Sequence, residues 1–366
     1  MKMKMKKKYV GLISILMAFF ITATGCGSSK TTDKVAGEKP VVRASLQPCL
    51  HGLPSWLAIE DGWVKDSPIN LELVFFKSGA PQNEALAANQ WDVGAMGTVP
   101  SILASIRYNA YMVGISNDES ETNDLWVKPD SPLLKTKGFN PKYPEIYGSP
   151  DDWKGKKILV TTVSTGAYAL GATLKDLGLT DKDVKMINMD QGQAITAFES
   201  NQADIVQLWA PYSYIAESKG WVKVSSGKRA GVSVPGALLV RKDFADKNPE
   251  LVVEWLDLYM RGIDYMKKDP AGANDWLFKF YNDYCGLDLG KELVAKDLEL
   301  RPLLDVNEQI KALEDPAIAK KSMTEITQFL VEQGQLTAAD KAKYENGNFI
   351  EPKFMKMLAE KRAKVK

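Results

Sequence analysis

Apolar residues follow two patterns along this chain, and the two patterns alternate. Short runs rich in valine, isoleucine and leucine predict buried strands, whereas stretches with an apolar residue every three or four positions predict helices with one buried face. The order strand, helix, strand runs from residue 41 to 115 and restarts from residue 157 to 219. We predict strands at residues 41–46, 69–76, 91–96, 110–115, 157–163, 184–189, 205–209 and 236–241. Strands separated by such helices indicate parallel α/β units, so we expect two α/β lobes, with the last strand returning to the first lobe.

A short internal repeat supports two lobes of related architecture. Residues 85–93 can be laid over residues 197–205 without a gap, and in each copy Asn-Gln stands shortly before an aspartate at the start of a predicted strand. The correspondence continues at the same offset as far as Ala104 and Ala216. Coincidence between two similar units is the alternative, because the motif is short, but the ungapped extension favours a common architecture.

The chain after residue 248 is predicted to be helical, at residues 249–267, 271–281, 291–300, 306–313 and 317–333. These segments carry many lysines and aromatic residues and no recognisable chemistry, and we expect them to pack behind one lobe. The predicted organisation is a first part of lobe 1 at residues 41–125, lobe 2 at residues 126–232, and a return to lobe 1 with the C-terminal helices at residues 233–366.

The N-terminal segment predicts export and membrane attachment. Five lysines precede an apolar run at residues 9–21, which is too short for a comfortable membrane span and fits a secretion signal. The run leads into Ala23-Thr24-Gly25-Cys26, which resembles the bacterial lipobox, where the cysteine is lipidated and becomes the mature N-terminus. An ordinary signal peptide with an incidental cysteine is the alternative. We predict a signal peptide at residues 1–25, lipidation of Cys26, a tether at residues 26–40, and a place on the extracytoplasmic face of the cell membrane.

Composition excludes several classes of function. Cleavage before Cys26 would remove five lysines, so 47 basic and 46 acidic residues would become 42 and 46, which is not the basic footprint of a nucleic-acid binder. The chain has one histidine, His51, so a multi-histidine zinc site is impossible, and we expect neither a metal nor a cofactor. Cys49 and Cys285 could form a disulfide, but two buried free thiols are the better prediction.

Several segments, taken together, resemble one known family. The matching segments are residues 41–54, 78–80, 85–94, 97–100, 163–166, 190–193 and 208–212. With the lipobox and the helical C-terminus, they resemble the solute-binding proteins of ABC importers, and in particular the nitrate, aliphatic sulfonate and taurine type, which also includes binders of pyrimidine thiamine precursors. The stretch at residues 129–150, rich in proline, lysine and tyrosine, departs from the family's pattern.

The resemblance implies a periplasmic-binding-protein-like fold, in which hinge strands join two α/β lobes that close on a small solute. It implies a monomer that delivers the solute to an ABC permease and its ATPase, with no residue performing covalent chemistry. An enzyme related to pyrimidine synthases is one alternative, and export away from cytoplasmic substrates argues against it. A structural surface lipoprotein is another, and the paired lobes argue against that.

The candidate ligand-binding residues lie where strands lead into helices. In open α/β sheets, ligands bind beyond the carboxyl ends of the strands, where helix N-termini offer free N–H groups. Three helix starts combine a small residue with a hydroxyl, namely Ser78-Gly79, Gly97-Thr98 and Ser164-Thr165-Gly166. Each hydroxyl could merely cap its own helix, but the three together favour the lining of a cleft.

Gln47, His51 and Trp209 are further candidates. Gln47 and His51 follow the first strand, where the resemblance implies a ligand-facing loop, although a lone histidine is about as often a surface residue. Trp209 ends a strand of the second unit and could stack on a flat or cationic ligand, or belong to the core.

The sign of the ligand's charge stays open at this point. The family binds anions or zwitterions, and helix N-termini favour an anion. Asp118 and Glu119, in an acidic stretch, and Asp190, at a strand end, would instead favour a guanidinium ion or a small amine. A solvated acidic loop is the alternative for that stretch.

Overall fold

The computed structural model describes residues 39–365 of the chain. The predicted signal peptide, Cys26 and most of the predicted tether lie outside the described residues. Residues 39–366 belong to one compact unit, and the account below concerns this unit alone. None of the helices described is both long and apolar enough to cross a bilayer.

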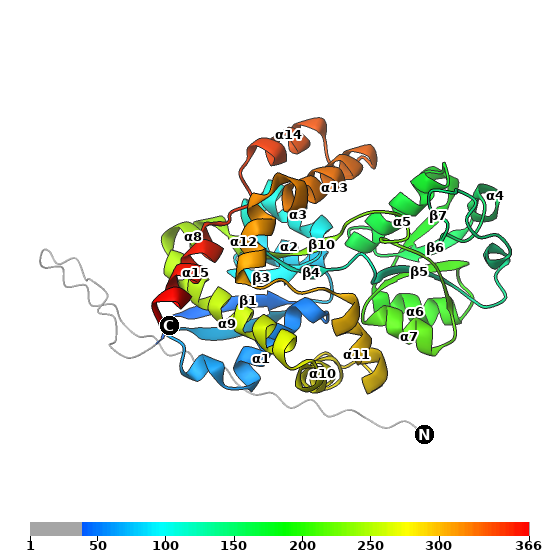
Figure 1. The fold of residues 1–366 in the computed structure, drawn as a ribbon. Coiled ribbons are helices and arrows are strands. Elements are labelled where there is room, and N and C mark those ends of the chain that lie inside the picture. Colours follow the sequence, from blue (N-terminus) through cyan, green and yellow to red (C-terminus); the bar gives the residue numbers. More distant parts are fainter. Residues whose placement is uncertain (1–38, 366) are drawn as a thin grey trace, which may run out of the picture. The chain divides into compact units, whose positions relative to one another are not determined.

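Lobe 1 is built on a sheet whose strands, within residues 39–365, lie in the order β2-β1-β3-β10-β4 (Figure 1). Its elements are β1 (Val41–Leu46), α1 (Leu53–Glu60), β2 (Asn70–Phe75), α2 (Gly79–Ala87), β3 (Val93–Met96), α3 (Thr98–Tyr108), β4 (Ala110–Asp118) and β10 (Pro235–Arg241). Strand β1 runs parallel to β2 and β3, whereas β10 is antiparallel to β3 and β4. The last predicted strand therefore does return to the sheet of lobe 1.

Lobe 2 repeats this arrangement, and its described strands lie in the order β7-β6-β8-β5-β9 (Figure 1, green). Its elements are β5 (Asn123–Val127), α4 (Pro150–Trp153), β6 (Lys157–Val160), α5 (Thr165–Asp176), β7 (Lys185–Asn188), α6 (Gln191–Glu199), β8 (Ile205–Trp209), α7 (Tyr212–Ser218) and β9 (Val222–Ser226). Strand β6 is parallel to β7 and β8, and β5 is antiparallel to β8 and β9. In each lobe, the fourth strand is the one that enters from the other lobe.

The internal repeat corresponds to matching local structure. Helices α2 and α6 are each followed by an asparagine with left-handed backbone, Asn89 at φ 54° and Asn201 at φ 57°. The aspartate three residues later then accepts a hydrogen bond from a neighbouring strand: Asp92 from the backbone N–H of Arg43 (3.1 Å), and Asp204 from that of Lys157 (2.8 Å). The motif thus ends a helix and fixes the register of the next strand.

Two crossover segments connect the lobes, residues 119–122 between β4 and β5 and residues 227–234 between β9 and β10. They are hydrogen-bonded to each other. The backbone N–H of Glu119 donates to the carbonyl of Val234 (3.0 Å), and the N–H of Lys228 donates to the carbonyl of Ser120 (2.7 Å). Two short crossovers held side by side are suited to a hinge between the lobes.

The C-terminal helices cover lobe 1 and also reach lobe 2. They are α8 (Lys242–Lys247), α9 (Pro249–Lys268), α10 (Pro270–Lys279), α11 (Lys291–Leu300), α12 (Val306–Glu314), α13 (Lys321–Glu332), α14 (Ala338–Asn346) and α15 (Lys353–Val365), with π-helical turns at Phe280–Tyr284 and Pro316–Lys320. The expectation that these helices pack behind one lobe is wrong for two of them. Phe329 of α13 meets Tyr168 of α5 edge to face, with ring centroids 4.8 Å apart, and Asp297 of α11 accepts a hydrogen bond from Tyr214 of α7 (2.8 Å).

The stretch at residues 129–150 packs onto lobe 2. Leu133 and Ile146 are buried in the same small core as Trp153. The backbone N–H of Tyr147 donates to the carbonyl of Val224 on the edge strand β9 (3.0 Å). This stretch therefore adds apolar cover to lobe 2.

Candidate functional site

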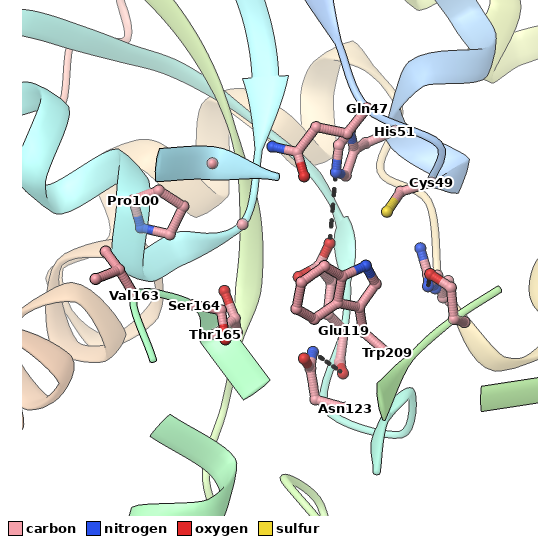
Figure 2. A pocket seen from close by; sticks show the side chains of 14 residues that line it. Gln47, Cys49, His51, Pro100, Glu119, Asn123, Val163, Ser164, Thr165 and Trp209 are labelled. Atoms are coloured by element: carbon pink, nitrogen blue, oxygen red, sulfur yellow. Dashed lines mark hydrogen bonds and ion pairs between the residues drawn. The ribbon is translucent and has the colours of Figure 1, made fainter. Parts of the chain in front are cut away.

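A small cavity of about 30 Å³ lies between the lobes, with residues of both lobes on its walls (Figure 2). Its lining residues are Gln47, Cys49, His51, Gly79, Gly97, Pro100, Glu119, Asn123, Val163, Ser164, Thr165, Trp209, Ala210 and Arg301. Nearly all the polar side chains among them are buried. A cavity with mixed walls, in which a few buried polar side chains stand among apolar ones, is suited to a small ligand held away from bulk water.

Lobe 1 supplies one wall through the loop after β1 and two helix starts. Gln47, Cys49 and His51 come from this loop and lie together in Figure 2. Gly79 and Gly97 stand at the starts of α2 and α3, and no side chain within residues 39–365 caps the first turn of either helix with a hydrogen bond. The free N–H groups of such a helix start favour a negatively charged or carbonyl group.

Lobe 2 supplies the opposite wall. Ser164 caps α5, because its hydroxyl accepts from the N–H of Ala167 (3.1 Å), while Thr165 follows it at the cavity. A side chain at Gly97 would overlap the Thr165 hydroxyl, so glycine permits the close approach of the two lobes. Trp209, at the carboxyl end of β8, is 9% exposed, and its backbone N–H donates to the side chain of Gln191 (2.9 Å).

Five predicted site residues do not line this cavity. Ser78 is buried beside Gly79, and the Thr98 hydroxyl donates to the carbonyl of Pro235. Gly166 packs so tightly against Gln207 that a side chain there would overlap it. Asp118 accepts a hydrogen bond from the N–H of Ser120 (2.7 Å), and Asp190 is an exposed residue at the start of α6.

Arg301 is the site residue that sequence reasoning missed most clearly. It follows α11, in a region that we expected to carry no chemistry, yet its side chain is 1% exposed and lines the cavity. Its Nε lies 2.9 Å from the Asp297 carboxylate. The spacing Asp-x-x-x-Arg at a helix end was a visible signal, but such pairs are common on solvated helix faces.

The charges at the cavity are unusual. Burial raises the pKa of Glu119 to about 7, although the positive charge of Arg301 opposes this rise. Burial and the same Arg301 charge lower the pKa of His51 to about 3, so His51 is neutral at pH 7. His51 Nε2 lies 4.0 Å from the Glu119 carboxylate, as drawn in Figure 2. Arg301 itself keeps its charge. Burial alone would lower its pKa, but Asp297 and neighbouring groups together raise the pKa by more than burial lowers it.

Three buried polar atoms of the lining residues have no hydrogen-bond partner within the described part of the chain. They are His51 Nδ1, Thr165 Oγ1 and Arg301 Nη1. Leaving a buried donor or acceptor unpaired costs about 1–3 kcal/mol, and more for a charged group. A bound ligand or ordered water would relieve that cost, so the walls are arranged to receive polar atoms.

Comparison with known proteins finds relatives that are named as binding proteins for small solutes. The family model described as NMT1/THI5 like matches residues 144–273. A Bacillus subtilis protein, whose name provisionally assigns it the binding of aliphatic sulfonates, is 30% identical over 84% of this chain and 88% of its own length. The taurine-binding periplasmic protein of Escherichia coli is 26% identical over 80% of this chain and 87% of its own length.

A solved structure shows the same fold. The periplasmic aliphatic sulphonate binding protein SsuA of Escherichia coli superposes with a TM-score of 0.64 at 17% identity, over 84% of this chain and 92% of that one. The predicted fold, two α/β lobes of the periplasmic-binding-protein type, is thereby confirmed.

Proposed function

The chain belongs to the NMT1/THI5-like family of ABC-transporter periplasmic solute-binding proteins, and from this membership we propose that it captures a small oxyanion of the sulfonate class between its lobes. Delivery of the solute to an ABC permease and its ATPase follows from the role of the family. The relatives are named as binding proteins, so the expectation that the chain is not an enzyme is confirmed.

One observation carries the proposal: buried polar atoms on the cavity walls lack partners among residues 39–365. His51 contributes one from lobe 1, Thr165 one from lobe 2, and Arg301 one from the C-terminal segment. A ligand that binds all three must lie between the lobes. Its binding would therefore favour the closed arrangement.

An anion fits these walls better than a cation. Two uncapped helix starts and a buried guanidinium surround the cavity, and all of them favour negative charge. The cationic alternative depended on Asp190 or on the acidic stretch, which holds Asp118, Glu119 and also Glu121. Of these acids only Glu119 lines the cavity, whereas Glu121 forms an ion pair with Lys228.

A thermal-shift screen tests the ligand class. Residues 30–366, which include the whole compact unit, would be mixed with nitrate, methanesulfonate, taurine, guanidinium and ethylamine. A ligand at a hundred times its Kd adds about 2.7 kcal/mol to the stability of the folded state, which is an easily measured shift. Stabilisation by a sulfonate supports the proposal, and stabilisation by cations alone overturns it.

We propose in addition that Cys26 carries a lipid that holds the monomeric protein on the extracytoplasmic membrane face. The support is the lipobox and its preceding apolar run, which lie outside the described residues. Replacing Cys26 by serine should move the protein from the membrane fraction to the soluble fraction. Light scattering on the soluble protein tests the monomer, and a dimer mass would contradict it.

A further inference from the structure

Arg301 lies at the centre of a buried polar cluster at the lobe boundary, which we call the Asp297 cluster. The cluster consists of Arg301, Asp297, Tyr214 and Tyr281. Arg301 and Asp297 are one helical turn apart, 1% and 0% exposed, and 2.9 Å apart between Nε and Oδ1. The paired charges cancel, so the cluster adds almost no net charge to the protein interior.

Two tyrosines hold the Asp297 carboxylate, and they come from different parts of the fold. Tyr214 lies on α7 in lobe 2, and its hydroxyl donates to Oδ1 of Asp297 (2.8 Å). Tyr281 lies in the π-helical turn after α10, beside lobe 1, and its hydroxyl donates to Oδ2. Of these two bonds, only that of Tyr214 reaches lobe 2, where an ion pair between Lys296 of α11 and Glu217 of α7 makes a second, more exposed connection.

The guanidinium of Arg301 also bonds to the first crossover and to lobe 2. Its Nε donates to the hydroxyl of Thr122 in the first crossover (3.1 Å), and its Nη2 donates to the carbonyl of Ala210 after β8 (2.8 Å). Its third nitrogen, Nη1, is buried, belongs to a residue that lines the cavity, and has no partner within residues 39–365. Two of the three nitrogens are thus committed to the protein, and one remains for a ligand.

We propose that Arg301 binds the anionic group of the ligand through Nη1 and, through Ala210 and the Asp297 cluster, couples that contact to closure of the lobes. The proposal rests on the proposed function, because it assigns the residue that recognises the anion in the same cleft. A guanidinium suits this task because its planar fork can serve three acceptors at fixed angles. An ammonium group could not hold the same three positions.

A pair of near-isosteric probes tests the anion contact. Methanesulfonate and methanesulfonamide have almost the same shape, but only the first is charged at pH 7. Calorimetric titration gives the Kd of each, and their ratio is the charge preference. We expect the wild-type protein to prefer methanesulfonate by at least about ten-fold, and the Arg301→Gln variant to have lost this preference, with about a hundred-fold weaker binding of the sulfonate.

The matched control for this variant is Arg43→Gln. Arg43 also pairs with a buried carboxylate, that of Asp92 (2.7 Å), but it does not line the cavity. The control should keep the charge preference even if it unfolds at a lower temperature. If Arg301→Gln does not fold, Arg301→Lys takes its place, and we expect it to lose at least about ten-fold of the preference because one ammonium cannot serve Asp297, Ala210 and the ligand together.

A second matched pair tests the coupling to closure. Tyr214→Phe and Tyr281→Phe each remove one hydroxyl hydrogen bond from Asp297, but only the first bond crosses between the lobes. In Tyr214→Phe we expect both probes to bind about three- to ten-fold more weakly with the ratio unchanged, because fewer molecules are closed. In Tyr281→Phe we expect a smaller change.

The outcomes separate this inference from the proposed function. Wild-type protein that binds sulfonates, together with an Arg301→Gln variant whose preference stays within about three-fold of wild type, overturns the role of Arg301 and leaves the proposed function standing. Unchanged affinities in Tyr214→Phe overturn the coupling. Wild-type protein that binds no anion overturns both proposals.

Discussion

Glu119 is a carboxylic acid in a cavity that we propose to bind an anion, so its protonation state decides whether it helps or hinders. Its pKa of about 7 results mainly from burial, with Asp118 and Asp297 raising it and Arg301 lowering it. Below pH 7 the neutral acid can donate a hydrogen bond to an oxyanion. Above pH 7 the carboxylate repels the anion, since the neighbouring His51 is neutral and cannot compensate.

We therefore expect the affinity for methanesulfonate to fall as the pH rises from 6 to 8.5, approaching about ten-fold per unit above the pKa of Glu119. Kd values measured across this range provide the test. The Glu119→Gln variant, which stays neutral, should give a nearly flat profile. A wild-type profile that is already flat would show that Glu119 does not face the bound anion.

The same residue would respond differently to an aminosulfonate. The ammonium group of taurine could pair with the ionised carboxylate, so taurine affinity should not fall over that pH range. Comparing the two pH profiles would therefore show whether Glu119 faces the anionic end of the ligand or its other end.

Replacing Trp209 tests whether the ligand binds at the lobe 2 wall of this cavity. The indole lines the cavity and contacts Tyr212 edge to face, with centroids 6.5 Å apart. Replacing it by alanine opens the wall to water, and we expect methanesulfonate to bind at least about ten-fold more weakly, a loss of about 1.4 kcal/mol.

The control for this substitution is Trp221→Ala, which removes a buried indole from the core of the same lobe but leaves the cavity lining intact. It should lower the stability of the protein and leave the Kd close to the wild-type value. Equal affinities for the Trp209→Ala and wild-type proteins would place the ligand elsewhere.

At the scale of elements, the repeated asparagine turn explains why one motif could be recognised twice in the sequence. A residue with positive φ at a helix end favours asparagine or glycine, because other side chains clash with the backbone there. The Asn-Gln-x-Asp motif combines that requirement with an aspartate that binds the next strand. The motif could therefore be recognised in the sequence because the backbone geometry of the turn requires these residue types.

Asn89 is the better of the two positions for a measurement, because the side chain of Asn201 also accepts a hydrogen bond from Lys128. We expect Asn89→Ala to lower the free energy of unfolding by about 1 kcal/mol, and Asn89→Gly to leave it nearly unchanged. Urea denaturation of the two variants provides the measurement. An alanine variant as stable as the glycine variant would show that the turn changes its conformation.

Elements with a strong local signal were predicted, and elements that depend on distant partners were not. Strand β1 and helix α11 have the predicted limits because apolar periodicity and flanking breakers mark them. Strand β9 was missed, and β5 was not separated from the acidic stretch before it. Strand β5 lies between β8 and β9 in the sheet, but its residues follow an acidic stretch that reads as a loop.

The candidate site divides in the same way. Glycines and hydroxyl residues at helix starts could be chosen as candidates from the sequence, because strand-to-helix junctions converge at one edge of each sheet. Arg301 could not be placed, because its role depends on α11 packing where the two lobes meet, more than ninety residues after Ala210. Long-range packing of this kind leaves no periodicity in the sequence.

At the scale of the whole molecule, contacts of the C-terminal helices bridge the lobes away from the ligand, and two of them bury aromatic side chains. One is the Tyr214 bond to Asp297, and the other is the meeting of α13 with α5, where Phe329 packs on Tyr168 and Glu332 lies 3.6 Å from Lys175. Contacts that form only between closed lobes lower the free energy of the closed state and therefore raise the apparent affinity, although they never touch the ligand.

Phe329→Ala removes one such contact without altering the cavity lining. An edge-to-face aromatic pair contributes about 0.5–1.5 kcal/mol beyond its buried area, so we expect binding of methanesulfonate to weaken by about two- to ten-fold. Because the loss acts through the closed population, the preference for methanesulfonate over methanesulfonamide should not change. Small-angle scattering should show that the ligand-free variant has a radius of gyration at least as large as the wild-type protein.

The matched control is Phe278→Ala, which removes a half-buried phenylalanine that packs against the core of lobe 1. It should cost stability and leave the affinity unchanged, since its ring is not part of the α5–α13 contact. If Phe329→Ala binds as tightly as wild type, the contact between α13 and α5 does not favour the closed state. Closure would then depend on the ligand and on the contacts of α11 with lobe 2, and the long C-terminal segment would serve to bring Arg301 to the cleft.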